Sequence, residues 1–427
     1  MNVNHDGYSR RLDRVRDIFG GLEANILKIV PVAYNEKFPF PFNNYLYKVT
    51  LRNPIGASLA GVQCGTTAAP TDADTFILRL SSLKADGLNN ENRIQNEVAS
   101  SMLARQALVA AGLERLVPDI YAWAPPTSLE STEEKHFGWI ISEYKNGSDL
   151  DKCFPTLSNE KQTEAVAQMA AILYALQNAT LPLSVTQVGG ITFDETGTMV
   201  SGQSSLTEDG PWSDFVDIWI SKLRKRLVAV TDDASKAAPA DNQIFQRIDA
   251  FISHGGIQKL LSGLGASRCL IHGDFTMNNM LYDVNDGRIT ALLDFDFSRV
   301  SHPVEEYQMG LYDMGHSMLD HPSDIWPSIV ANDFSSPPAG LKEEDMTLWK
   351  RAAQWNSIAR EKGVFVPGDI DGIGQLKKLE QLSDALAAFE TGDPAATAGP
   401  SDSDDETTQK RQVIVKKVVD LMNELGM

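Results

Sequence analysis

The sequence predicts an α+β fold of two lobes, in which a small lobe of strands and one helix precedes a larger, mainly helical lobe. Apolar residues alternate over residues 45–51 and 75–80, as in half-buried strands, and helical periodicity dominates the second half of the chain. The chain has 427 residues, too many for one compact core of ordinary size. We therefore expect residues 1–145 to form the first lobe and residues 146–390 the second.

The elements of the first lobe can be assigned in order along the chain. Residues 10–30 change from polar to apolar in a pattern typical of an entry helix. The strand over residues 45–51 follows an aromatic, proline-rich stretch, and the strand over residues 75–80 follows a loose segment. Residues 91–111 carry apolar side chains at four-residue spacing, which predicts a helix with Gly112 as its C-terminal cap.

The second lobe is expected to be helical around a few short strands. The apolar run over residues 138–144 predicts a buried strand that joins the two lobes. Residues 166–176 predict a strong amphipathic helix, and Pro211 is expected to open another. Apolar segments within residues 269–297 predict short strands separated by polar loops.

The end of the chain differs in composition from the rest. Residues 391–408 combine Gly, Pro, Ala and Ser with acidic side chains, which predicts a flexible acidic linker. Residues 409–427 are amphipathic again and predict a C-terminal helix that docks on the body of the protein or on a partner.

Charge and cysteine content exclude several classes of function. A formal net charge of −19 argues against non-specific binding to nucleic acid and favours cationic ligands, or simply solubility. The cysteines Cys64, Cys153 and Cys269 form neither a disulfide framework nor a zinc-binding pattern. The chain begins without an apolar signal core, and no run approaches the roughly 18 apolar residues that span a membrane. We expect a cytoplasmic protein without membrane partners; the sequence does not set its oligomeric state.

Two segments between residues 269 and 297 contain the polar residues that are candidates for catalysis and metal binding. An apolar strand ends at His272, and the polar loop after it presents Asp274 and Asn279. A later apolar strand ends in Asp294-Phe295-Asp296. Carboxylate and amide oxygens of this kind suit Mg²⁺. Phosphoryl transfer needs such a metal, a carboxylate near the attacking hydroxyl and a cation on the phosphates.

The pattern His-Gly-Asp, four residues, Asn, and then Asp-x-Asp resembles the aminoglycoside phosphotransferase and choline kinase families. The resemblance implies a bilobal protein-kinase-like fold and an ATP- and Mg²⁺-dependent kinase that acts on the hydroxyl of a small molecule. It makes Asp274 the catalytic carboxylate, Asn279 and Asp294 the magnesium ligands, and Asp296 a further metal residue. His272 is expected to brace the loop rather than to act as a base.

The resemblance extends upstream, through roughly residues 25–390, and is strongest to fungal-type members. Arg79 matches the strand cation that touches phosphates, and Glu97 matches its helix partner. Arginine in place of the commoner lysine keeps the charge and adds a bidentate fork. The resemblance further implies an ATP site with two parts: a glycine-free covering loop containing Asn43 and Asn44, and an adenine-binding strand end at Ser142, Glu143 and Tyr144.

The motif details separate the chain from other kinases. The loop reads His-Gly-Asp instead of His-Arg-Asp, and the metal strand ends Asp-Phe-Asp instead of Asp-Phe-Gly, so a protein substrate is not expected. There is no GxxxxGK[ST] phosphate loop. One hypothesis gives the acceptor an ammonium group, bound by carboxylates and aromatic rings. The candidate acceptor-binding residues are Trp212, Glu305, Glu306, Tyr307 and Asp313.

Two other functions remain open from the sequence. A kinase-fold enzyme can use ATP for another condensation, such as carboxylate activation and amide formation. A nucleotide-binding scaffold without catalysis is the second alternative; the intact Asp274, Asn279 and Asp294 argue against it, whereas the glycine-free loop and Arg79 favour it mildly.

Overall fold

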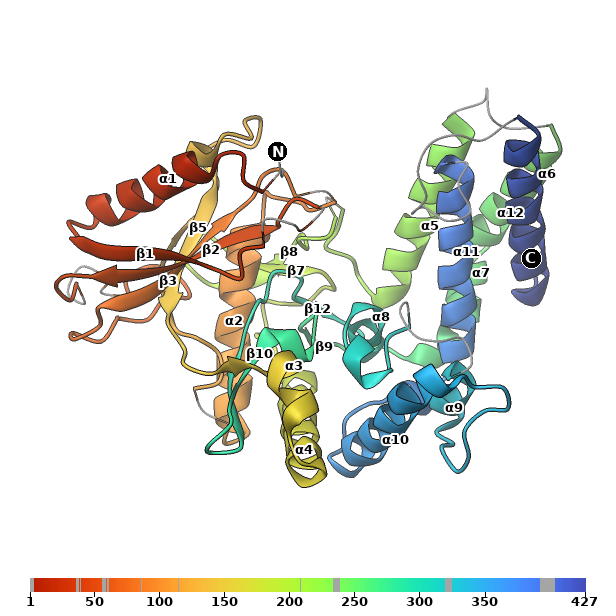
Figure 1. Ribbon diagram of the computed structural model, residues 1–427. Helices are drawn as coiled ribbons and strands as arrows, with labels where there is room; N and C mark the ends of the chain where they lie inside the picture. The colour runs from red at the N-terminus through yellow and green to blue at the C-terminus, as the bar shows by residue number, and fades with distance from the viewer. Residues whose placement is uncertain are drawn as a thin grey trace. The chain divides into compact units, whose positions relative to one another are not determined.

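The structure, a computed structural model, divides into two compact units (Figure 1). It describes residues 4–35, 38, 40–55, 59, 61–85, 87–113, 115–207, 209–232, 239–318, 325–391 and 404–427. The first unit comprises Met1–Pro211, Arg268–His321 and Lys342–Phe365; the second comprises Trp212–Ser267, Pro322–Leu341 and Val366–Met427.

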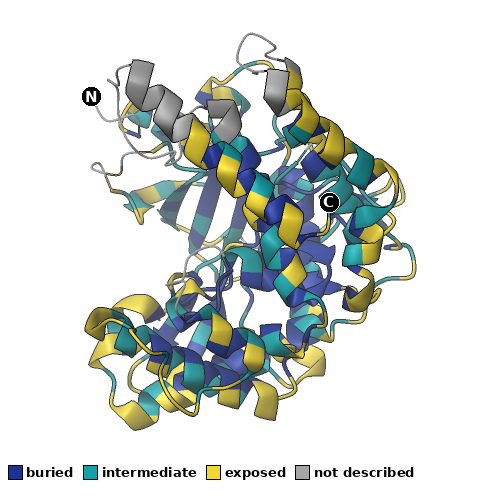
Figure 2. Ribbon diagram, turned by 90° about the vertical axis from the view of Figure 1, so that its right-hand side faces the viewer, coloured by how far each residue is buried: buried dark blue, intermediate teal, exposed yellow. Residues whose placement is uncertain are grey.

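A five-stranded antiparallel sheet opens the first unit, with the strand order β1-β2-β3-β5-β4 (Figure 1). The strands span Ile26–Val32 (β1), Asn44–Leu51 (β2), Thr75–Ser81 (β3), Ile120–Ala124 (β4) and Gly138–Glu143 (β5). The strands expected over residues 45–51, 75–80 and 138–144 are therefore present. Buried residues, drawn dark blue in Figure 2, are concentrated in β2, β3, β4 and β5, whereas the edge strand β1 has none.

The helix expected over residues 10–30 ends nine residues earlier than predicted. Helix α1 spans Tyr8–Gly21, and the residues after it turn back into strand β1. Gly20 and Gly21 lie at the end of the helix, where their poor helix propensity favours a stop. Strand β1 then pairs antiparallel with β2, so its apolar residues belong to a sheet edge and not to a helix face.

Two helices cover the two faces of the sheet. Val15 and Phe19 of α1 pack into a core with Leu78 of β3. Helix α2, which spans Arg93–Ala110, packs Ile94 and Val98 against β4 and β5. Because side chains alternate along a strand, the residue after Leu78 points away from α1 and toward α2.

Short strands in the rest of the first unit carry the polar loops. They form small sheets of order β11-β10-β6, β12-β9 and β7-β8. Their bounds are Ser148–Asp149 (β6), Gly190–Phe193 (β7), Met199–Gly202 (β8), Cys269–Ile271 (β9), Met280–Asp283 (β10), Arg288–Leu292 (β11) and Arg299–Ser301 (β12). The ends of β9 and β11 thus stand directly before His272 and close to Asp294, as the sequence predicted.

Helices complete both units. The first contains α3 (Leu150–Cys153), α4 (Asn159–Gln177), α8 (Glu306–Met309) and α10 (Met346–Glu361). The second contains α5 (Phe215–Asp232), α6 (Pro239–Ser253), α7 (Gly256–Leu260), α9 (Trp326–Ala331), α11 (Ile373–Thr391) and α12 (Asp404–Glu424). Helix α4 packs against α10, and α11 packs against α5 and α12. The predicted α+β class, with strands and a helix followed by a mainly helical chain, is confirmed.

Two helix starts differ from the expected ones. Helix α5 begins at Phe215 and not at Pro211. Helix α12 begins at Asp404, inside the expected linker, and residues 392–403 lie outside the described residues. Within the described part of the chain, every helix is too short or too polar to cross a membrane.

Candidate active site

Arg79 and Glu97 form a buried ion pair between the sheet and helix α2. Arg79 follows Leu78 on β3 and therefore points toward α2, where both of its Nη atoms contact the Glu97 carboxylate. Burial alone would lower the pKa of Arg79, but three neighbouring carboxylates, chiefly that of Glu97, raise it. The structure thus brings together the two residues that the sequence paired, and it keeps the arginine charged.

Asp296 lies at the centre of a buried network with two arginines. Its carboxylate accepts hydrogen bonds from Arg93 Nε at 2.7 Å and from Arg93 Nη2 at 2.6 Å, a bidentate arrangement. Arg79 Nη2 lies 3.1 Å from the same carboxylate, and the Asn44 amide donates to it at 3.0 Å. Burial alone would raise the pKa of Asp296, but Arg93 and Arg79 hold it well below its ordinary range. Asp296, expected to be a metal residue, therefore has both oxygens engaged by protein groups.

The loop after β9 is fastened from behind by Glu306. The buried Glu306 carboxylate accepts hydrogen bonds from the backbone N–H of His272 at 2.7 Å and that of Gly273 at 2.9 Å. Gly273 has a φ of +84°, and a Cβ there would lie 2.4 Å from the Phe297 carbonyl oxygen. Only glycine fits this conformation and this close approach. The motif glycine is therefore required by the backbone of the loop.

His272 braces two loops at once. Its Nε2 donates to the Leu293 carbonyl at 2.9 Å, and its Nδ1 accepts from the Asp274 N–H at 3.3 Å. Because a carbonyl can only accept, this arrangement assigns the ring proton to Nε2. Both ring nitrogens are occupied, which fits the bracing role expected from the sequence better than that of a general base.

Asp274 and Asn279 are held together on the same loop. The Asn279 amide donates to the Asp274 backbone carbonyl and to Asp274 Oδ2, both at 2.8 Å. The backbone carbonyl of Asn279 accepts from the Leu293 N–H at 2.8 Å. This bond joins the loop to the one that carries Asp294. The three polar residues that the motif predicted therefore lie on two loops joined by hydrogen bonds.

Asp294 adopts a strained backbone just after β11. Its φ is +61°, a left-handed conformation that costs a residue with a Cβ about 1–2 kcal/mol. Its Oδ1 lies 3.2 Å from Arg79 Nη1, and its side chain remains 45% exposed. Such outliers cluster at functional sites, where the surrounding structure holds them. Here the strain presents one partly exposed carboxylate beside the Asp274 loop.

Two oxygens on these loops fit a magnesium ion. Asn279 Oδ1 and Asp294 Oδ2 accept no hydrogen bond from any described residue. Mg²⁺ keeps several waters and usually takes only one or two protein oxygens beside substrate phosphates. Across the described ranges, no three His, Cys, Asp or Glu side chains gather into a self-sufficient metal cluster. The donor set therefore matches a metal that arrives with a phosphate ligand.

The expected adenine-binding segment is mostly engaged in the sheet. Ser142 pairs with Ile77 on one side and Ile120 on the other. The Glu143 N–H donates to the Asp119 carbonyl at 2.8 Å. The ring of Tyr144 lies 3.5 Å from Lys48 Nζ in a cation–π contact.

The covering segment is also used within the protein. The Asn43 carbonyl accepts from the Ser82 N–H and from Arg93 Nη2, each at 2.9 Å. The Asn44 amide bridges two partners, since its Oδ1 accepts from Arg93 at 3.0 Å while its Nδ2 donates to Asp296. The two asparagines predicted to meet phosphate thus belong to the Asp296 network.

Most of the predicted acceptor-binding residues are buried and occupied. Glu305 accepts from Arg299 Nε at 2.5 Å, and Tyr307 donates its hydroxyl to the Phe365 carbonyl at 2.5 Å. Glu306 holds the loop after β9, as described above. Trp212 belongs to the second unit. Glu305, Glu306 and Tyr307 thus use their polar side-chain atoms in contacts within the first unit.

Asp313 is the acceptor candidate that contacts the loop after β9. Its Oδ2 accepts from the Met277 N–H at 2.5 Å, and its Oδ1 is buried without a hydrogen-bond partner among the described residues. Burial raises the pKa of Asp313 to about 6, although the Met277 N–H and Arg351 act in the opposite direction.

Sequence reasoning missed Arg93 and Ser205. The hydroxyl of Ser205 donates to the Asp296 carbonyl, and Arg93 holds the Asp296 carboxylate. A signal for Arg93 was present, because it precedes Glu97 by four residues and so shares its helix face. No comparable signal marks Ser205, which lies in a loop far from the motif.

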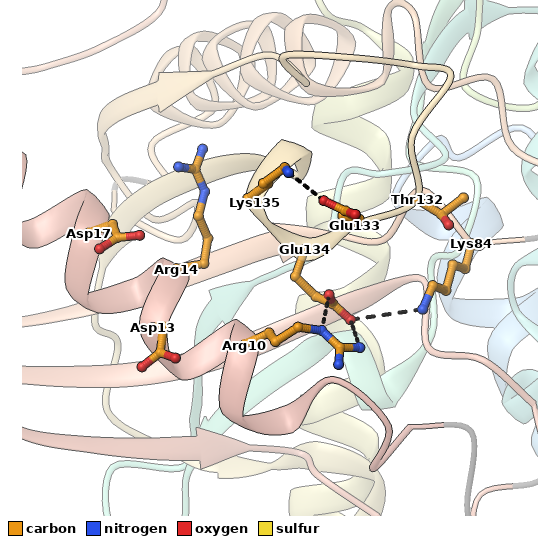
Figure 3. A pocket seen from close by; sticks show the side chains of 9 residues that line it. All are labelled: Arg10, Asp13, Arg14, Asp17, Lys84, Thr132, Glu133, Glu134 and Lys135. Atoms are coloured by element: carbon orange, nitrogen blue, oxygen red, sulfur yellow. Dashed lines mark hydrogen bonds and ion pairs between the residues drawn. The ribbon is translucent and has the colours of Figure 1, made fainter.

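A hollow of about 550 Å³ lies apart from these loops, between α1 and the 3-10 helix Glu134–His136 (Figure 3). Arg10 contacts Glu134 through two hydrogen bonds, of 2.7 and 3.1 Å, and Lys84 Nζ lies 3.8 Å from the same carboxylate. Lys135 pairs with Glu133 at 2.5 Å. The charged side chains that line this hollow are largely paired with one another, and none of the motif residues lines it.

A known protein family matches the part of the chain that contains Asp274, Asp294 and Asp296. A family model described as the phosphotransferase enzyme family matches residues 52–326, more than half of the chain. Of the residues around Asp296 and Asp274, only Asn43 and Asn44 lie outside this range. No curated protein matches the sequence. Nothing in these matches separates a fungal-type subgroup, so that finer resemblance stays a prediction.

Several solved structures are similar to the chain at low identity. The ADP-bound aminoglycoside phosphotransferase APH(2'')-Ib is 9% identical, with 96% of this chain and 98% of that chain covered and a TM-score of 0.46. The choline kinase from Cryptosporidium parvum is 13% identical, with 96% and 97% covered and a TM-score of 0.38. The Plasmodium vivax ethanolamine kinase is 12% identical, with 91% and 82% covered and a TM-score of 0.38.

Proposed function

The chain belongs to the phosphotransferase enzyme family, and from this membership we propose that it transfers the γ-phosphoryl group of ATP to a hydroxyl of a small molecule. The observation that carries the proposal is the pair of joined loops. Asn279 holds Asp274 through its side-chain amide, and its backbone carbonyl accepts from the Leu293 N–H, next to Asp294. The joined loops thereby hold the carboxylate that can take the hydroxyl proton, and they also hold the oxygens that can bind a metal ion.

Asp274 is the proposed catalytic carboxylate. Its Oδ2 is fixed by Asn279, and its Oδ1 accepts no hydrogen bond from a described residue. A carboxylate held in this way can orient an acceptor hydroxyl and take its proton as the oxygen attacks. His272 contributes by holding the loop and not by moving the proton, because both of its nitrogens are occupied.

Asn279 and Asp294 are the proposed magnesium ligands. When bound, Mg²⁺ neutralises charge on the phosphates of ATP and helps to hold them for in-line transfer. Asp296 is left out of the ligand set, because two arginines engage its oxygens. Arg79 keeps a positive charge beside Asp294, where it can steady both that carboxylate and an incoming phosphate.

The expected division of the chain is kept in this proposal. Residues 1–145 receive the nucleotide, and residues 146–390 contain the catalytic loop and the acceptor site. Since Ser142 and Glu143 use their backbone groups within the sheet, the adenine contact falls to Tyr144 and the residues after it. Asp313 is the proposed acceptor-side residue, because it touches the loop of Asp274 directly.

Calorimetric titration of ATP, with and without Mg²⁺, tests the nucleotide and metal parts of the proposal. We expect the parent protein to bind ATP with a dissociation constant in the micromolar range, which corresponds to a binding free energy of about −8 kcal/mol. Asp294→Ala should weaken binding about tenfold or more in the presence of Mg²⁺ and have little effect without it. The matched control is Asp286→Ala, which removes an exposed carboxylate from the turn of the same β10–β11 hairpin.

The outcomes separate the parts of the proposal. Equal ATP affinity in the parent and in Asp294→Ala at all Mg²⁺ concentrations would mean that Asp294 is not a metal ligand. Absence of ATP binding by the parent would remove the kinase function. If ATP binds as expected, a mass-spectrometric screen of hydroxyl compounds should find products heavier by one phosphoryl group; ligated or dehydrated products would instead indicate carboxylate activation.

A further inference from the structure

Arg93 connects three parts of the chain that are far apart in sequence. Its Nε and Nη2 bind the Asp296 carboxylate at 2.7 and 2.6 Å. Nη2 also donates to the Asn43 carbonyl at 2.9 Å and to Asn44 Oδ1 at 3.0 Å. Nη1 donates to the Ser82 carbonyl at 3.1 Å. The side chain is 1% exposed. This buried cation donates to the residue after β3, to the covering segment and to the Asp296 carboxylate.

We propose that Arg93 is a positioning residue that fastens the covering segment Asn43–Asn44 to Asp296 and so holds the ATP site preformed. The inference rests on the proposed nucleotide site and names the residue that orders it. Asn44 closes the connection, because its Nδ2 donates to Asp296 while its Oδ1 accepts from Arg93.

The covering segment is fixed at its other end as well. The Phe42 N–H donates to Asn4 Oδ1 at 2.7 Å, and the Asn43 carbonyl also accepts from the Ser82 N–H. The sequence Phe42-Asn43-Asn44-Tyr45 contains no glycine, so the backbone lacks the freedom of a glycine-rich loop. Side-chain hydrogen bonds from Arg93 and Asn4 thus add to the backbone pairing that holds Asn44 and Tyr45 against β3.

Arginine is required here by geometry and not by charge alone. The planar guanidinium presents donors in fixed directions, and acceptors on Asp296, Ser82, Asn43, Asn44 and Asn90 use them. A lysine would keep the positive charge beside Asp296 but could not serve the carboxylate, the Ser82 carbonyl and the Asn43 carbonyl together. A loosened segment must be ordered again when ATP binds, and this ordering reduces affinity.

The test compares Arg93→Lys and Asn44→Ala with a remote control, Arg10→Lys. Arg10 makes a bidentate pair with Glu134 and shares no hydrogen-bond partner with Arg93 (Figure 3). Hydrogen–deuterium exchange without nucleotide is measured on peptides that cover residues 42–45. Calorimetry measures the affinity for ATP with Mg²⁺. Asn44 is only half-buried, so its variant keeps the test valid should Arg93→Lys fail to fold.

We expect faster exchange over residues 42–45 in both variants, with exchange in β5 unchanged, and ATP binding weaker by about tenfold in Arg93→Lys. Arg10→Lys should match the parent in both measurements. The loss of ATP affinity in the double variant should be less than the sum of the two single losses, because Asn44 Oδ1 accepts from Arg93 and both side chains bind Asp296. A residue that only stabilised the fold would give additive losses and no local change in exchange.

The contrary results are distinct. Parent-like exchange over residues 42–45 and parent-like ATP affinity in Arg93→Lys and in Asn44→Ala would overturn the inference and leave the proposed kinase site untouched. If the parent itself bound no ATP, the proposed function would fall, and the role of Arg93 in that site would fall with it.

Discussion

Asp313 shows how burial changes one carboxylate beside the loop after β9. Its Oδ2 accepts from the Met277 N–H, but its Oδ1 is buried without a partner among the described residues. Burial destabilises the charged form of the acid, and this effect outweighs the opposing effects of the Met277 hydrogen bond and of Arg351. The pKa of Asp313 therefore rises to about 6 from an ordinary 3.8. The neutral acid is therefore the main form in the folded protein below about pH 6, and the carboxylate is the main form above it.

Asp313→Asn should remove a pH dependence of stability. Between about pH 4 and about pH 6 the folded parent holds a proton that the unfolded chain has lost, so its free energy of unfolding falls as the pH rises. The variant lacks this fall and should be more stable than the parent above about pH 6, by on the order of 3 kcal/mol. Urea unfolding of both proteins over this range checks the difference. A parent–variant difference that stays constant with pH would contradict it.

At the scale of elements, the sequence predicted what alternation and periodicity encode locally. Strands β2, β3 and β5 and helix α2 appear within a few residues of their expected bounds. Strand β1 was missed, since its apolar run continues from α1 and was interpreted as one long helix. The useful signals were Gly20-Gly21, which ends the helix, and Pro31, which edge strands tolerate.

Helices α1 and α2 offer a matched comparison across one sheet. Val15 of α1 and Val98 of α2 are both 0% exposed, in cores on opposite faces. Val15→Ala and Val98→Ala should each lower the free energy of unfolding by about 2 kcal/mol, because the same buried methyl groups are lost. Only Val98→Ala should also weaken ATP binding, since α2 carries Arg93 and Glu97.

Urea unfolding and ATP calorimetry on the two valine variants check this prediction together. Equal weakening of ATP binding by both substitutions would show that general destabilisation, and not displacement of α2, affects the site. An ATP affinity unchanged in both would show that α2 holds Arg93 and Glu97 firmly enough to tolerate the cavity.

At the scale of the whole molecule, the candidate site could be predicted in its loops but not in its connections. The order of Asp274, Asn279 and Asp294 along the chain was sufficient to place them on neighbouring strand ends. Arg93 and Asp296 are separated by 203 positions, and their contact depends on how α2 packs. Glu305 and Glu306 were interpreted as acceptor ligands because a sequence reveals charge but not burial; both are in fact held inside the first unit.

The charge of the whole chain leads to a prediction about the acceptor. A net charge of −19 creates a negative field that raises the local concentration of cations and repels anions. In a screen of paired compounds, an amino sugar should therefore give a higher kcat/KM than the neutral sugar of the same shape at low salt. The advantage should shrink as ionic strength rises, because the Debye length falls to about 8 Å under physiological conditions. An equal or better neutral acceptor, or an amine advantage unaffected by salt, would mean that local contacts select the acceptor and that the acidic surface serves solubility.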